Sequence, residues 1–165
     1  MKRGFTFIEL LIVITLIAIL TAIAYPQFVK YKLHSYNASA LSDLGGVYAT
    51  EIAFYTDCQE FVAISVNDIS ESGHIYKVVT LLNGKQAIFD FNPLSAHVLA
   101  SSKVDASRAS LVLVTKNTKG TKFFGRDTDV DEIRARRGTM GAPLEDDDVP
   151  NATLNQDDLA GWDDL

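Results

Sequence analysis

The feature that most constrains this chain is a run of 20 consecutive residues without a charged side chain, from Leu10 to Val29. Folded as an α-helix, about 20 apolar residues are enough to cross the hydrocarbon core of a bilayer. Lys2 and Arg3 precede the run and would stay on the cytoplasmic side by the positive-inside rule. The simplest interpretation of this region is therefore a single-span membrane anchor.

A second interpretation is a secretory signal that is removed from the mature protein. Ala22-Ile23-Ala24 fits the small-x-small pattern of a cleavage site, and the basic start fits the beginning of such a signal. Glu9 argues against it, because a carboxylate at the mouth of an apolar run has no use in a disposable segment. An ionisable group in a membrane segment is costly and indicates a function and a partner.

The third interpretation supplies that partner. The segment Gly4-Phe5-Thr6-Phe7-Ile8-Glu9, placed just before the apolar run, closely resembles the class III signal of type IV pilins and the related pseudopilins. Within the helix, the similarity is closest to type IVa pilins of the delta-proteobacteria. The resemblance implies that a prepilin peptidase cuts between Gly4 and Phe5 and methylates the new amino terminus of Phe5. It also implies that the apolar helix stays on the mature protein and that Glu9 guides assembly.

The spacing of Phe5 and Glu9 has a physical rationale. Removing residues 1–4 takes away two cations, changes the formal charge from −6 to −8 and exposes an α-amine at Phe5. An amine and a carboxylate four residues apart lie about one helical turn apart. Glu9 could pair with this amine in its own chain or in a neighbouring subunit, and a misplaced subunit would leave a buried charge unpaired. We therefore expect Glu9 to set the axial register of a polymer.

Helical spacing continues beyond the apolar run. Apolar residues recur three, four or seven positions apart, a pattern typical of an amphipathic helix. These positions are Val29, Leu33, Tyr36, Ala40, Leu44, Val47 and Phe54. The pattern predicts one helix from about Phe5 to Phe54 with its second half packed on a domain. Pro26 lacks a backbone donor and should bend or locally melt the helix.

The segment after Cys58 has the pattern of short antiparallel strands. Residues 75–82 and 86–91 flank Asn83-Gly84, a strong hairpin signal. Residues 97–104, 109–115 and 121–124 are further candidate strands. Four or five such strands laid over the second half of the helix would share one core. The predicted fold class is α+β, a long helix packed on a small antiparallel sheet, which is the ladle architecture that the pilin resemblance also implies.

We expect the chain to be organised as a leader (1–4), a hydrophobic helix segment (5–29), an amphipathic helix segment (30–57), a β-sheet headgroup (58–137) and an acidic tail (138–165). The tail contains eight acidic residues and no Lys or Arg. It is poor in strand-forming residues, so a mobile or loosely docked segment is expected, tethered by Leu154, Leu159 and Trp162. Its acids would be solvated, or would face basic residues of the next subunit.

One acidic loop is a candidate metal site. Asp127, Asp129 and Asp131 alternate along the chain, and hard carboxylate oxygens at such spacing suit calcium. The loop lacks the glycine and the final acid of an EF-hand, and several nearby arginines could neutralise the acids without a metal. Calcium is therefore a possible ligand of this loop, a solvated charged loop is the alternative, and no other cofactor is predicted.

Charge and motif content exclude several classes of function. A sequence pI near 4.9 argues against nucleic-acid binding, and a single cysteine, Cys58, excludes an intramolecular disulfide. No nucleophile–base arrangement or phosphate-binding glycine loop is recognisable, so catalysis is not expected.

The leading hypothesis is a structural subunit, the major pilin of a type IV pilus. Its expected partners are further copies of itself in a helical filament, the prepilin peptidase, the assembly platform and minor pilins. It would reside in the inner membrane as a single-pass precursor and then in an extracellular pilus of a Gram-negative bacterium. The alternatives are a pseudopilin of a type II secretion system, a minor pilin, and a single-span binding protein that never polymerises.

Overall fold

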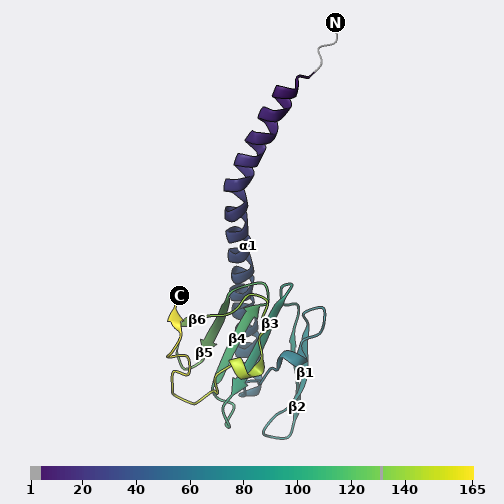
Figure 1. Cartoon of the computed structure of the whole chain (residues 1–165). Helices are drawn as coiled ribbons and strands as arrows, with labels where there is room; N and C mark the ends of the chain where they lie inside the picture. Colours follow the sequence, from purple (N-terminus) through teal and green to yellow (C-terminus); the bar gives the residue numbers. More distant parts are fainter. Residues whose placement is uncertain (1–4, 131) are drawn as a thin grey trace. The chain divides into compact units, whose positions relative to one another are not determined.

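The computed structural model describes residues 5–130 and 132–165, and within them one long helix precedes two antiparallel sheets. Helix α1 spans Phe7–Cys58. The chain divides into two compact units, the first ending at Ser35 and the second covering Tyr36–Leu165. The predicted α+β class, a long amino-terminal helix followed by antiparallel strands, is confirmed (Figure 1).

The second part of α1 contributes one face to the core of the second unit. Its buried positions are Ala40, Asp43, Leu44, Val47, Glu51 and Phe54, which recur at three- and four-residue spacing. Four of the seven apolar positions predicted for this face are therefore buried. Val29 is 47% exposed, because the buried face begins only at Ala40.

The strands form a hairpin and a separate larger sheet. Strand β1 (Ile75–Thr80) pairs with β2 (Gln86–Phe91), and the turn between them places Gly84 at a φ of 80°. The larger sheet has the order β3-β4-β5-β6-β7. Its strands are β3 (Val98–Val104), β4 (Leu111–Asn117), β5 (Lys122–Asp127), β6 (Ile133–Arg137) and β7 (Asp163–Asp164).

The prediction of one core shared by the strands and the helix is confirmed, because both the hairpin and the larger sheet contribute to the cluster that contains the α1 residues. The prediction of a single sheet was wrong. The outer edge of β3 is occupied by the segment that follows the helix, because the Ser102 amide donates to the Ile64 carbonyl at 2.8 Å. The Ser102 hydroxyl completes the contact by donating to the carbonyl of Val62 and accepting from the amide of Ile64. Strand β2 therefore cannot pair with β3, and the hairpin stands beside the larger sheet as a sheet of its own (Figure 1).

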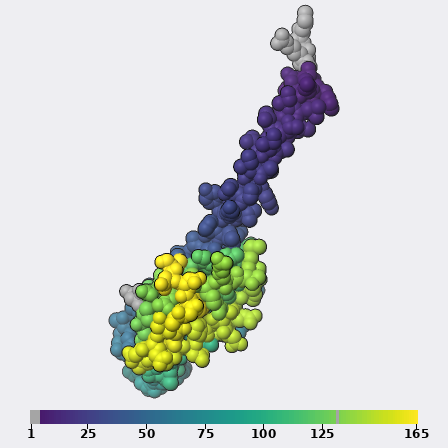
Figure 2. All heavy atoms as spheres, turned by 60° about the vertical axis from the view of Figure 1, so that its left-hand side comes forward, coloured from purple at the N-terminus to yellow at the C-terminus, as the bar shows by residue number. Residues whose placement is uncertain are grey.

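Strand β4 is buried on both faces. Leu111 and Leu113 belong to the core cluster that contains the α1 residues, whereas Val112 and Val114 belong to a second cluster. This second cluster is completed by Phe123 and by Leu144, Val149 and Leu159 of the carboxy-terminal segment. Strand β4 therefore lies between α1 and residues 144–162, and Figure 2 shows the carboxy-terminal segment in yellow-green to yellow over one face of the unit.

The expectation of a mobile or loosely docked acidic tail is corrected by these contacts. Leu159 is buried as predicted, but Leu154 is 45% exposed and is not a tether. Basic side chains of the sheet hold the segment: Lys116 donates to the Thr139 carbonyl at 3.0 Å, and Arg136 pairs with Asp148 at 2.9 Å. Strand β4 needs a cover on its second face, and the tail provides it.

Candidate functional site

Helix α1 begins with a reciprocal pair of side-chain caps. The Thr6 hydroxyl donates to Glu9 Oε2 at 2.7 Å, and the Thr6 amide donates to the same oxygen at 2.8 Å. In return, the Glu9 amide donates to Thr6 Oγ1 at 3.3 Å. This is a capping box, in which two backbone donors of the first turn are satisfied by side chains. Glu9 therefore has a local role at the helix start in addition to the assembly role predicted from the sequence.

The sequence analysis missed Thr6, although a signal for it was present. A Ser or Thr followed three residues later by an acid, just before an apolar run, is the signature of a capping box. Thr6-Phe7-Ile8-Glu9 fits this pattern. The resemblance drew attention to the acid alone, whereas the geometry assigns the threonine and the glutamate to one unit.

The surface that follows the cap is apolar and uncovered. Helix α1 is long and apolar enough to cross a membrane, and none of its apolar stretch is buried within the described chain. Individual side chains such as Leu16, Leu20 and Ile23 are 55–66% exposed. Two hydroxyls in this stretch bond within the helix, Thr15 to the Ile12 carbonyl and Thr21 to the Ile17 carbonyl, each at 2.8 Å. These hydroxyls therefore do not prevent the surface from packing against lipid or other apolar helices.

The processing residues flank this site. Phe5 is 83% exposed, and Gly4 lies outside the described residues. Helix α1 continues through Pro26 without interruption, so this region is helical; the bend expected there stays a prediction. The cleavage, the methylation of Phe5 and the guiding role of Glu9 likewise stay predictions.

The calcium candidates have other partners. Asp127 is 1% exposed; its Oδ1 accepts from the Asp129 amide and its Oδ2 from the Asp158 amide at 2.9 Å. Asp129 Oδ2 accepts from the Ser110 hydroxyl at 2.8 Å and from the Asn155 amide at 3.0 Å. Burial raises the pKa of Asp127 above its usual range. These two carboxylates tie the end of β5 to the carboxy-terminal segment.

Asp131 lies outside the described residues, so the calcium prediction, which involves all three acids, stays a prediction. Among the residues that are described, no group of three His, Cys, Asp or Glu side chains could hold a metal ion.

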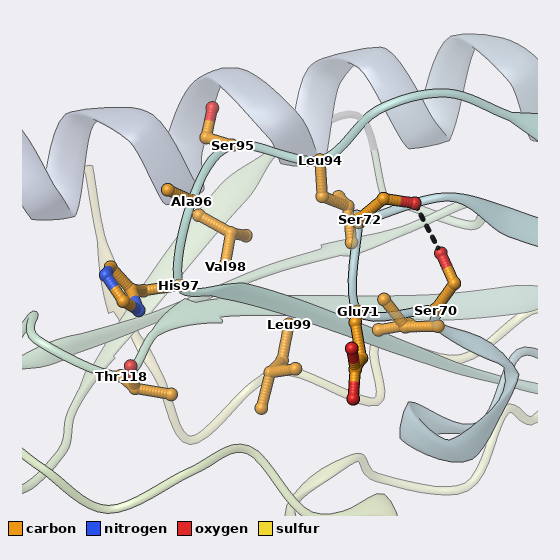
Figure 3. A pocket seen from close by; sticks show the side chains of 12 residues that line it. Ser70, Glu71, Ser72, Leu94, Ser95, Ala96, His97, Val98, Leu99 and Thr118 are labelled. Atoms are coloured by element: carbon orange, nitrogen blue, oxygen red, sulfur yellow. Dashed lines mark hydrogen bonds between the residues drawn. The ribbon is translucent and has the colours of Figure 1, made fainter.

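A hydroxyl-lined pocket of about 490 Å³ lies between two loops of the second unit. Figure 3 shows Glu71 and His97 on its opposite sides. The hydroxyls of Ser70 and Ser72 are 2.9 Å apart and share a hydrogen bond, drawn as a dashed line in Figure 3. Its apolar lining includes Leu94 and Leu99. The ring of His74, which directly precedes β1 and lies outside the pocket lining, pairs with Asp90 at 2.8 Å.

One buried carboxylate was not anticipated from the sequence. Glu51 is fully buried on the core face of α1, and its Oε2 accepts from the Val62 amide at 3.1 Å. Its Oε1 has no hydrogen-bond partner among the described atoms. Burial raises the pKa of Glu51 to about 8, against the opposing effects of the Val62 amide and of Lys77. An acid in the apolar face of an amphipathic helix, at the spacing of Leu44 and Val47, is the signal that could have identified it.

Comparisons with known proteins agree with the features of the helix. A family model described as the prokaryotic N-terminal methylation motif matches residues 1–25. The type IV major pilin protein PilA of Myxococcus xanthus is 42% identical over 56 residues, which are 34% of this chain and 26% of that protein. The fimbrial protein EcpC of Eikenella corrodens is 41% identical over 56 residues, 34% of this chain and 37% of that protein.

The family model covers residues 1–25, and each relative aligns with about a third of this chain. The chain thus spans about a quarter to two fifths of the length of the curated relatives it matches. The motif match and the two relatives agree with the capped, uncovered apolar helix described above. The chain carries the prokaryotic N-terminal methylation motif, and a third of it is similar to a type IV major pilin and to a fimbrial protein.

Proposed function

We propose that this protein is a structural subunit, the major pilin of a type IV pilus, which polymerises through α1 after cleavage between Gly4 and Phe5. The observation that carries the proposal is the uncovered apolar surface of α1, which begins with a capped acid. An apolar helix of this length is stable only in lipid or against other apolar helices. A filament core built from neighbouring copies of α1 provides the second environment.

Glu9 supplies the specificity of that packing. Its carboxylate is held by Thr6 through Oε2, which leaves Oε1 for a second donor. Cleavage would create such a donor, the α-amine of Phe5 in the same or in a neighbouring copy. Because an unpaired charge is expensive in an apolar core, only the register that brings amine and carboxylate together is favourable. No step of this assembly requires catalysis by the chain itself.

The proposal is tested with a Glu9→Ala variant of the full chain in its host. We expect the variant to be processed after Gly4, to accumulate in the membrane and to yield few or no sheared filaments. Glu9→Gln is the matched control for size, because it keeps the shape and removes the charge; it should also fail to assemble. Normal filaments from both variants would refute the role of the charge.

The same experiment separates the two related functions. A major pilin should be the main protein of sheared extracellular filaments. A pseudopilin should instead remain with the cell envelope, and its deletion should block the export of other proteins. Mass spectrometry of the sheared and envelope fractions therefore decides between them.

A further inference from the structure

A groove at the edge of the larger sheet has no role in the proposed function. This groove, of about 540 Å³, is lined by Leu41 of α1, Ile133 of β6 and Leu165, with Glu132 and Asp164 beside them. Glu132 and Leu165 are exposed, and the side chain of Asp164 is 82% exposed. The groove thus combines an apolar floor with two accessible carboxylates.

The two charged side chains that line this groove, Glu132 and Asp164, are both acidic. Arg134 is the basic residue of the cluster, and it lies 3.2 Å from Glu132, 2.8 Å from Asp157 and 3.5 Å from Asp164. Its side chain is only 14% exposed, so three carboxylates share one guanidinium that is itself largely covered. A cationic side chain of another molecule would therefore contact a negatively charged rim beside the apolar floor of the groove.

The first unit carries a surface of the complementary kind. Phe28, Tyr31 and Lys32 lie three and four residues apart, so they share one face of α1. Phe28 is 61% exposed and Tyr31 is 74% exposed. The Lys32 ammonium lies over the Phe28 ring, 5.7 Å from its centroid. We call this face, made of Phe28, Tyr31 and Lys32, the aromatic–lysine face.

The sequence makes this part of α1 uniformly basic. Between Glu9 and Asp43 the chain contains two lysines and one histidine and no acidic residue. The carboxy-terminal segment, which contributes Asp164 and Leu165 to the groove, contains eight acidic residues and no Lys or Arg. Basic and acidic surfaces are therefore segregated at different places along one chain.

We propose that the groove formed by Leu41, Glu132, Ile133, Asp164 and Leu165 receives the aromatic–lysine face of a second copy of this chain. The aromatic rings would cover the apolar floor, and the ammonium of Lys32 would approach Glu132 and Asp164. Every copy carries both surfaces, so the contact is heterologous, and a heterologous contact that does not close into a ring generates an open helical polymer. The inference rests on the proposed filament function and names one of the contacts that would build it.

The charge pair contributes mainly to specificity. Complementary charges at an accessible rim select the partner and its register, whereas the covered apolar area supplies the attraction. The charged residues of this contact, Lys32, Glu132 and Asp164, lie outside the apolar stretch of α1, so their interaction is screened by salt, unlike a pair at Glu9 in the filament core. The two contacts are therefore separable by mutation.

The test measures the yield of sheared filaments from full-length variants in the host. Lys32→Glu should lower the yield about tenfold or more, since an opposed charge replaces an attractive one in every interface. Lys30→Glu is the matched control: it makes the same change of charge two residues away, about 200° around the helix, and should change the yield less than about twofold. Glu132→Lys should lower the yield as much as Lys32→Glu does. If Glu132→Lys reduces the amount of folded subunit, Asp164→Lys is used as a second variant of the groove.

Co-expression gives the decisive result. A Lys32→Glu copy and a Glu132→Lys copy are mutually complementary, so together they should restore filaments that neither forms alone. A contact within one chain would not be restored in this way. Equal loss from Lys30→Glu and Lys32→Glu, which contact with lipid headgroups would produce, or no rescue on co-expression, would overturn the inference. In either case, filaments formed by the unmodified chain would still support the proposed function. The proposed function is refuted only if the unmodified chain forms no filaments.

Discussion

The Thr6 hydroxyl lies 2.7 Å from Glu9 Oε2, and this contact places the helix start and the proposed assembly charge in one unit. From the sequence, Glu9 is a charge that awaits a partner amine. The capping box shows that it already has a partner within its own chain, which reduces the number of unsatisfied groups while the helix is in the membrane. Thr6 therefore becomes as informative a target as Glu9.

Replacing Thr6 should affect assembly through the cap. Thr6→Val keeps the size and removes the hydroxyl, and we expect a loss of about 1 kcal/mol in helix stability at this terminus. The filament yield should fall because Glu9 is no longer held in position. Thr6→Ser keeps the hydroxyl and should retain most of the yield, which is measured by quantifying subunit in the sheared fraction. Equal yields from the two variants would contradict the cap.

The buried carboxylate of Glu51 predicts a dependence of stability on pH. Its pKa is raised from 4.5 to about 8, so the folded state favours the protonated form. The stabilising contribution is fully present below about pH 4.5 and is lost as the pH rises through about 8. Each pKa unit corresponds to about 1.4 kcal/mol, so the loss for this fully buried group amounts to several kcal/mol.

A Glu51→Gln variant tests this prediction. It resembles the protonated acid, so its free energy of unfolding should exceed that of the unmodified chain at pH 8 and approach it at pH 5. Denaturation of the detergent-solubilised full chain at the two pH values measures the difference. Glu71→Gln changes an exposed acid and should leave the pH dependence unaltered. If the stability of the Glu51→Gln variant depended on pH in the same way as that of the unmodified chain, the raised pKa of Glu51 would be refuted.

The docking of the carboxy-terminal segment can be tested with two leucines of that segment. Leu159 is 1% exposed and packs with Val112, Val114 and Phe123. Leu159→Ala should lower the free energy of unfolding by about 2–5 kcal/mol through the cavity it creates. Leu154→Ala is the matched control, because Leu154 is 45% exposed, and it should cost less than about 0.5 kcal/mol. Similar effects at both positions, measured by denaturant titration, would mean that the segment is not docked.

Lys116 should anchor the beginning of the same segment. This side chain is fully buried; its ammonium donates to the carbonyls of Thr139 and Ala142 and lies 4.6 Å from the centroid of the Phe123 ring. Lys116→Met would remove the ammonium from both carbonyls, leaving the Thr139 carbonyl only the Ala142 amide as a donor, and should cost about 1–3 kcal/mol. Lys119→Met removes an exposed cation and should be close to neutral. Faster proteolysis within residues 139–143 of the Lys116→Met variant is the expected readout; unchanged proteolysis would contradict the anchor.

The helix and the hairpin were predictable because their signals are local. The spacing of Ala40, Leu44, Val47 and Phe54 predicts a core face, and Asn83-Gly84 predicts the turn between β1 and β2. The docked tail was missed because its contacts are distant in sequence: Asp146 accepts from Ser65 and Ser101, 81 and 45 residues away. Composition alone suggested solvated acids.

A signal for that docking was nevertheless present in β4. Leu111-Val112-Leu113-Val114 is continuously apolar, without the alternation of a strand that has one solvated face. Such a strand must be covered on both faces. The helix, which precedes β4 in the sequence, covers one face of this strand. The residues after β6 were therefore the candidates for covering its other face. Similarly, the Thr6–Glu9 pattern was readable as a capping box, whereas the partners of Asp127 and Asp129 depended on the position of Asn155 and Asp158.

The central claim is that cleavage after Gly4 exposes an amine at Phe5 that Glu9 requires for polymerisation. The most direct test is the intact mass and amino-terminal sequence of the subunit in sheared surface filaments. We predict a polypeptide that begins at Phe5, carries one additional methyl group and is the main protein of the filaments. A filament subunit that begins at Met1 or at Tyr25 would contradict the claim.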